Sequence, residues 1–127
     1  MKNMAQHRRI FEYIGAQYGA RPEYLWRKYP EFAVFRNCHN NKWFAMIMNI
    51  TADKLGLRGT DMVYVLNIHC SPSLLATVLN DGDFLPGYHM NKATWSTIVL
   101  DGHLTDAQIF PLIQASYESV APAAHGK

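Results

Sequence analysis

The sequence contains little cysteine, few charged residues and no long apolar run, and each shortage excludes a class of protein. Its two cysteines, Cys38 and Cys70, are too few for a disulfide framework, so we expect reduced thiols in a cytoplasmic protein. No apolar run reaches the roughly 18 residues of a membrane-spanning helix, and no membrane partner is expected. Residues 1–9 carry charges with no apolar stretch behind them, unlike a secretory signal.

Motifs for nucleotide chemistry are also missing, because the chain has neither G-x-x-x-x-G-K-[ST] nor G-x-G-x-x-G. Cysteine and histidine are adjacent at 38–39 and at 69–70. Neighbouring side chains on a strand point to opposite faces, so neither pair forms an internal catalytic couple. Turn chemistry accounts for Asp81, Asp83 and Asp101. We therefore expect a protein that is not an enzyme and has neither catalytic residues nor a cofactor.

A metal site is a weaker alternative. Zinc prefers four nitrogen or sulfur ligands at short regular spacings such as C-x₂-C, and such spacings are absent. We expect no metal, and a metal or small-molecule binder built on these side chains ranks last among the hypotheses. The candidate ligands would be Cys38, His39, His69, Cys70 and His89.

What the chain does contain is enough apolar sequence for one domain. It has 127 residues, of which 49% are hydrophobic and 17% charged, a composition unlike that of disordered chains. We expect a single domain over residues 1–120 and a flexible tail over residues 121–127.

Hydrophobic periodicity and turn residues predict the elements in order. A first helix is expected over residues 2–18, with an apolar stripe that ends at Gly19. Residues 23–32 are an aromatic connector. Ser71 and Pro72 predict the start of a second helix, and Thr105 with Gln108 predicts a capping box for the last. Strands are expected at 33–38, 42–50, 62–69 and 94–100, with a short additional one near 84–88.

The predicted order is therefore helix, three strands, helix, one or two strands, helix. Hairpins of this kind with helices packed on one face give a two-layer α+β fold with an antiparallel sheet. Pro111 lies past the first turn of the last helix, where it removes a backbone hydrogen bond and predicts a kink.

Charge is unevenly distributed between the two halves. Residues 1–60 hold ten Lys or Arg and four Asp or Glu, whereas residues 61–127 hold two and six. A basic half suits a polyanion, although a solvated surface explains the same pattern.

Polar, basic and aromatic residues gather around two predicted turns. Lys and Arg neutralise phosphates, Asn and His donate to phosphates or base edges, and aromatic rings stack on bases. Trp43 and Trp95 begin strands, a position more typical of core residues, so Lys42 and Lys92 are the better contact candidates. The candidate DNA-binding residues are Arg36, Asn41, Lys42, His89, Asn91, Lys92 and Trp95.

The same segments carry a family resemblance. Asn41-Lys42-Trp43-Phe44-Ala45, Pro86-Gly87-Tyr88-His89-Met90-Asn91-Lys92 and the following Trp95 resemble the MmcQ/YjbR family of small bacterial proteins. The resemblance covers roughly residues 4–120. It implies a two-layer α+β fold of the frataxin-like (CyaY-like) type and a DNA-binding role through β-hairpin wings.

The leading hypothesis is thus a non-enzymatic, monomeric protein that binds DNA phosphates through its β-turn segments. The alternative is a protein- or peptide-binding adaptor without affinity for nucleic acid, since an α+β sheet can present an open face or edge strand. Its interface would be the aromatic connector, with Tyr24, Trp26, Tyr29 and Phe32.

Overall fold

The computed structural model describes residues 5–80 and 82–121. Residues 1–4, which begin the predicted first helix, and residues 122–127 of the predicted tail lie outside this range. No helix in the described ranges is both long enough and apolar enough to cross a membrane.

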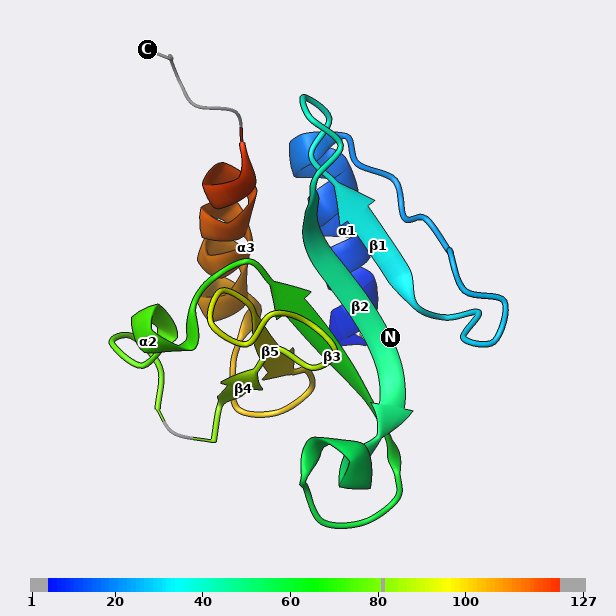
Figure 1. Ribbon diagram of the computed structural model, residues 1–127, viewed down its shortest axis with the longest axis vertical. Coiled ribbons are helices and arrows are strands. Elements are labelled where there is room, and N and C mark those ends of the chain that lie inside the picture. The colour runs from blue at the N-terminus through cyan, green and yellow to red at the C-terminus, as the bar shows by residue number, and fades with distance from the viewer. Residues whose placement is uncertain (1–4, 81, 122–127) are drawn as a thin grey trace, which may run out of the picture.

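The predicted α+β fold is confirmed, with five strands and helices in the expected order (Figure 1). The helices are α1 (Gln6–Tyr18), α2 (Pro72–Leu75) and α3 (Asp106–Val120), with a 3₁₀ turn η1 (Ala52–Leu55). The strands are β1 (Ala33–Arg36), β2 (Trp43–Thr51), β3 (Met62–Ile68), β4 (Phe84–Pro86) and β5 (Ser96–Val99).

All strand pairs are antiparallel, and the sheet order is β1-β2-β3-β5-β4. The long strand β2 pairs with β3 from Ala45–Ile68 to Thr51–Met62, which makes this pair the spine of the sheet. β3 pairs in turn with β5, and β5 with the short strand β4.

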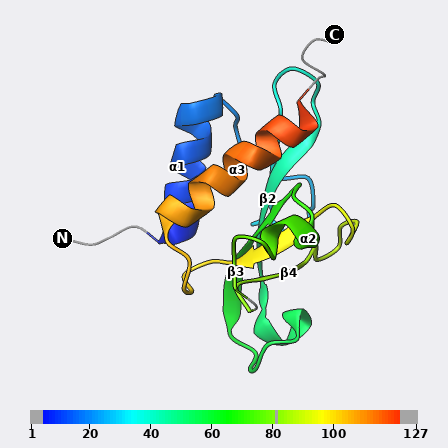
Figure 2. The same cartoon turned by 90° about the vertical axis from the view of Figure 1, so that its left-hand side faces the viewer.

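One face of the sheet packs against α1 and α3. Figure 2 shows both helices on the same side of the strands. Ile10 and Ile14 of α1 and Ile109 and Ile113 of α3 are fully buried in one core cluster with Phe35 of β1. The two isoleucines of each helix are four residues apart and lie on the same side, so both helices bury one side against the sheet.

The opposite face, called here the second face, is apolar as well. Met46, Met48 and Ile50 alternate along β2 with residues of the helical face and form a second cluster with Val34 and Val65. No helix covers this face in the described residues. It is covered instead by the connector and by the segment after β4, which lies across the sheet from α1 and α3 in Figure 2.

The elements differ from the sequence-based prediction mainly in length. The helix that begins after Ser71 becomes irregular after Leu75, because the following bonds join Thr77 N to Leu74 O and Val78 N to Leu75 O. Each of these spans only three residues, and β-branched Thr77 and Val78 favour such a departure. Residues 52–55, between the strands predicted at 42–50 and 62–69, form η1, and Pro111 lies inside α3, with its ring exposed.

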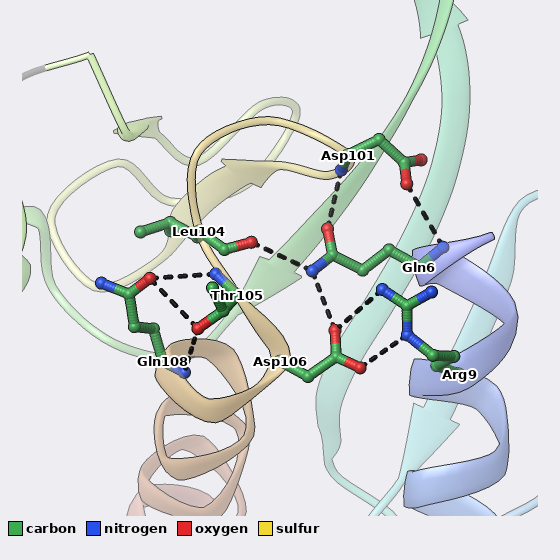
Figure 3. A network of polar contacts seen from close by, with 7 residues as sticks. All are labelled: Gln6, Arg9, Asp101, Leu104, Thr105, Asp106 and Gln108. Carbon is green, nitrogen blue, oxygen red and sulfur yellow. Dashed lines mark hydrogen bonds and ion pairs between the residues drawn. The ribbon is translucent and has the colours of Figure 1, made fainter. Parts of the chain in front are cut away.

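The start of α1 is held by residues about 95 positions later (Figure 3). Its N-cap residue Ala5 has no side chain for capping, and the backbone N–H of Gln6 donates to Asp101 Oδ1 at 3.3 Å. The buried Gln6 side chain donates to Leu104 O at 3.1 Å and to Asp106 Oδ1 at 2.9 Å, and accepts from Asp101 N at 2.7 Å. Gln6 thus joins α1, the turn after β5 and the start of α3.

An ion pair in the same network predicts a pH dependence of stability. The Nε of Arg9 lies 2.6 Å from Asp106 Oδ2, and this hydrogen bond, aided by Gln6, holds the pKa of Asp106 below its ordinary value of 3.8. A carboxyl group with a lowered folded-state pKa stabilises the protein above pH 3.8, and that contribution disappears as the pH falls through the folded-state pKa.

We therefore expect Asp106→Asn to lower the free energy of unfolding by about 1 kcal/mol at pH 7. The difference between the two proteins should shrink steadily below pH 4, as measured by thermal unfolding at a series of pH values. A Tm difference that is constant from pH 7 to pH 2 would contradict this assignment. Asp53→Asn, at an exposed site in η1, is the control.

Candidate functional site

The two predicted contact segments lie at the same end of the sheet. Trp43 begins β2, Ile68 ends β3 and Ser96 begins β5, so the hairpin turn (residues 37–42) and the 87–95 segment flank the end of β3. His69 lies between them. Its ring makes an edge contact with Trp95 at a centroid distance of 5.3 Å, and burial together with the positive charge of Lys42 lowers its pKa.

The asparagines of the hairpin turn maintain its shape. Asn41 has a φ of 62°, in the left-handed region that Asn tolerates. Asn37 Oδ1 accepts from His39 N at 2.8 Å, and Asn40 Oδ1 accepts from Lys42 N at 3.0 Å. The Asn40 amide also donates to Val120 O at 2.6 Å, which fastens the turn to the end of α3. The side chain of Lys42 is exposed.

Arg36 is largely committed to local contacts. Its Nε donates to both carboxylate oxygens of Glu23, at 3.0 and 3.1 Å, and its Nη1 donates to Asn41 O at 3.0 Å. The guanidinium also lies 5.9 Å from the ring centroid of Trp43. Arg36 therefore links the connector to the hairpin turn, and the carboxylate of Glu23 offsets the positive charge of Arg36.

The 87–95 segment is anchored to the second face by a buried polar network. Asn67 is fully buried in β3, and its Nδ2 donates to Tyr88 O at 3.0 Å. The hydroxyl of Thr97 donates to Asn67 Oδ1 and accepts from Tyr88 N at 2.8 Å. Both backbone groups of Tyr88 are thus satisfied by side chains of the sheet, which fixes the segment in place.

The remaining predicted site residues of this segment divide into supporting and exposed positions. Asn91 Oδ1 accepts from Ala93 N at 2.9 Å, and Lys92 Nζ donates to Gly87 O at 2.8 Å. Trp95 is only 9% exposed, so its ring faces the protein rather than a base. His89 is exposed and has a φ of 61°. Lys92 keeps two further N–H donors, since an ammonium group carries three.

The histidines and cysteines do not assemble into a metal site within the described ranges, where no group of three or more His, Cys, Asp or Glu could hold an ion. His69 Nδ1 lies 2.7 Å from Ser119 Oγ, and Cys38 Sγ lies 3.6 Å from the hydroxyl of Tyr117. Cys70 is buried, and burial raises the pKa of its thiol.

A cavity that sequence reasoning missed lies on the second face. It has a volume of about 400 Å³ and is bounded by the connector, by β2 and by the 87–95 segment. Met46, Met48 and Ile50 of β2 alternate with buried residues of the other face, a pattern that indicates a strand covered on both sides. Residues lining the cavity are Trp26, Tyr29, Phe32, Trp43, Met46, Ile50, Lys54, Tyr88, His89 and Met90.

Sequence similarity shows which protein family this chain belongs to. The sequence profile of the YjbR family matches residues 15–119. The chain belongs to the YjbR family. This confirms the resemblance seen in the sequence. The matched range contains every described strand and nearly all of α3, but only residues 15–18 of α1.

Relatives within the family share both sequence and structure with the chain. Uncharacterized protein YyaQ of Bacillus subtilis is 40% identical over 108 residues, covering 85% of this chain and 92% of that protein. Uncharacterized protein YjbR of Escherichia coli K12 is 43% identical over 54 residues, covering 42% of this chain and 46% of that protein.

Two solved structures of a Pseudomonas syringae protein have the same fold. The crystal structure has a TM-score of 0.85 at 34% identity, covering 93% of this chain and all of that one. The solution structure has a TM-score of 0.82 at 33% identity, covering 96% and 98%. The names of these relatives describe no ligand, so function rests on the geometry of the site.

Proposed function

We propose that this protein is a non-enzymatic DNA-binding protein that contacts backbone phosphates through the hairpin turn and the 87–95 segment. The observation that carries the proposal is the charge of these neighbouring segments. Neither segment contains an Asp or Glu, and each segment carries one lysine that is exposed to solvent. Among the described residues, no Asp or Glu forms an ion pair with Lys42 or Lys92.

The geometry suits phosphate contact better than base readout. A lysine ammonium is a point charge that binds phosphate from many directions, whereas reading a base edge requires side chains held in a fixed orientation. Arg36 is held by Glu23, and Trp95 is buried. The interface therefore depends on Lys42 and Lys92, with the exposed His89 on the same segment as Lys92, and affinity should be modest and nonspecific.

Binding to labelled duplex DNA of random sequence tests the proposal by fluorescence anisotropy. Two phosphate contacts predict a slope of roughly −2 for log K against log salt, and a dissociation constant in the range of about 10⁻⁴ to 10⁻⁶ M. Lys42→Ala with Lys92→Ala should weaken binding at low salt at least about tenfold and flatten the slope.

The matched control is Lys54→Ala, which removes the same charge from η1, beyond the opposite end of β2. At near-physiological salt it should leave DNA affinity within about twofold of the wild type, because η1 follows the opposite end of β2 from the hairpin turn and exposed charges are screened over roughly 8 Å. Equal losses in the double variant and in Lys54→Ala would contradict the assignment to the turns. Absence of binding even at low salt would refute the DNA proposal itself.

A second candidate function is the protein- or peptide-binding adaptor, and one observation favours it. Tyr24 is 54% exposed, Leu25 46% and Tyr29 39%, so three large apolar side chains of the connector face solvent. Trp26 and Phe32 face inward and do not contribute. Partners recovered from lysate that survive nuclease treatment and are lost in Tyr24→Ser with Leu25→Ser would support the adaptor.

A further inference from the structure

The cavity on the second face has walls that are fixed before any ligand arrives. On one side, the ring of Trp26 makes edge contacts with Trp43 and Phe32, at centroid distances of 5.9 and 6.0 Å, and Tyr29 stacks on Phe32 at 4.7 Å. Glu23 pairs with Val34 and with Arg36, which holds the connector against β1.

The other wall is equally constrained. The Asn67–Thr97 network holds both backbone groups of Tyr88, and the left-handed conformation of His89 turns the chain so that Tyr88 and Met90 both reach the cavity. Because both walls are already held in place, the protein loses little conformational entropy when a ligand binds. Its volume of about 400 Å³ lies within the range of small-molecule sites.

The lining specifies the chemistry of a ligand. Rings from both walls and the thioethers of Met46 and Met90 offer surfaces for a flat aromatic body. Among the residues that line the cavity, Lys54 and His89 are the ones that can carry a positive charge. None of the lining residues is an Asp or Glu. A ligand with an anionic group would therefore be complementary in charge as well as in shape.

A free nucleobase fits this cavity poorly. The floor at Met46 and Ile50 presents sulfur and aliphatic carbon, which cannot replace the hydrogen bonds that a base makes with water. An aromatic ring system without polar edges gives up no hydrogen bonds to water when it enters the cavity. Its anionic group can remain near solvent beside the exposed Lys54.

We propose that this cavity is a binding site for a small planar aromatic anion, such as an aromatic carboxylate or sulfonate, with its rings between the connector and Tyr88 and its charge beside Lys54. The inference does not depend on DNA binding. The site lies on the second face, and although His89 is one of its lining residues, neither Lys42 nor Lys92 is.

Two fluorescent probes of similar aromatic shape separate the apolar and ionic parts of the proposal. We would use 1-anilinonaphthalene-8-sulfonate, which carries the sulfonate, and N-phenyl-1-naphthylamine, which is neutral. The anionic probe should bind the native protein saturably with one site per chain. Lys54→Ala should weaken it about five- to tenfold and leave the neutral probe unchanged, with Lys42→Ala as the charge-matched control.

Filling the cavity tests its location. Met90→Trp adds a ring to a half-buried position on the wall and should weaken both probes at least about tenfold, with Ile50→Phe as a second filling variant if Met90→Trp does not fold. Methyl NMR gives a direct readout. The resonances of Met46 and Met90 should shift when the anionic probe binds, whereas Met62, which is 55% exposed and outside the cavity, should not.

Three results would overturn the proposal. They are the absence of saturable binding by the folded protein, binding that a folded filling variant leaves intact, and stronger competition by adenosine monophosphate than by an aromatic carboxylate. Failure of DNA binding has no bearing on these readouts, and the reciprocal effects of Lys42→Ala and Lys54→Ala keep the two proposals separate.

Discussion

Gln6→Leu should lower the free energy of unfolding by about 3 kcal/mol and the Tm by roughly 10 °C. The side chain of Gln6 is 3% exposed and makes three hydrogen bonds, to Leu104 O, Asp106 Oδ1 and Asp101 N. Leucine has a similar volume but no polar atom. The loss therefore comes from carbonyl and N–H groups left without partners in a buried position, rather than from a cavity.

The measurement is thermal or urea unfolding of the wild type, Gln6→Leu and Gln17→Leu. Gln17 lies on the same helix but is exposed, so its replacement should change the Tm by no more than about 2 °C. Circular dichroism would verify that each variant is folded before heating. Similar Tm values for Gln6→Leu and Gln17→Leu would show that the network in Figure 3 contributes little to stability.

Local signals in the sequence predicted where the later helices begin, whereas the turn residues near Asn80 placed the end of the second helix too late, because α2 ends at Leu75. Ser71 accepts from Leu74 N, and Thr105 forms both bonds of its capping box with Gln108. These contacts join residues three positions apart, so the residues that form them are visible together in the sequence. The short strand predicted near residues 84–88 is confirmed as β4, which pairs with β5.

Contacts between distant residues were not predictable in the same way. Nothing near Gln6 indicates that Asp101 completes the start of α1, or that a glutamine there is buried. Asn67 gave a partial signal, because a single amide within an apolar strand must find buried partners. Its partners Tyr88 and Thr97 lie 21 and 30 positions away, and only the fold brings them together.

The candidate DNA site illustrates the same limit. The sequence placed lysines and asparagines in turns, and the structure puts both turns at one end of the sheet. It did not reveal that Asn91 and Lys92 hold the backbone of their own segment. The residue types that bind phosphate are also those that satisfy turns, so composition alone does not distinguish the two roles.

The cavity was missed for a related reason. The aromatic connector and the apolar strand β2 each suggested core packing. The sequence shows that both are apolar, but it does not show that a cavity remains between them. The clearest available sign was β2, where Met46, Ile47 and Met48 make the strand apolar on both faces, although the predicted helices cover one. A covering segment was therefore required on the second face.

Gly87→Ala should destabilise the protein by about 2–3 kcal/mol and lower its Tm by roughly 10 °C, because the added methyl has no room. A Cβ at this position would lie 2.7 Å from Trp95 Cβ, 3.0 Å from Trp95 O and 3.1 Å from Met90 Cβ. These atoms are backbone or the first atoms of side chains, which cannot rotate away. The 87–95 segment must therefore move, which disturbs the hydrogen bond that Gly87 N donates to Trp95 O at 2.9 Å.

Gly102→Ala is the matched control, since a Cβ there meets only Val99 O, at an ordinary 3.6 Å. Its Tm should stay within about 3 °C of the wild type. Displacement of Met90 also alters the wall of the cavity, so Gly87→Ala should weaken the neutral and anionic probes together, unlike Lys54→Ala. A Gly87→Ala protein with wild-type Tm and unchanged probe binding would mean that the close approach of the 87–95 segment to Trp95 is not required.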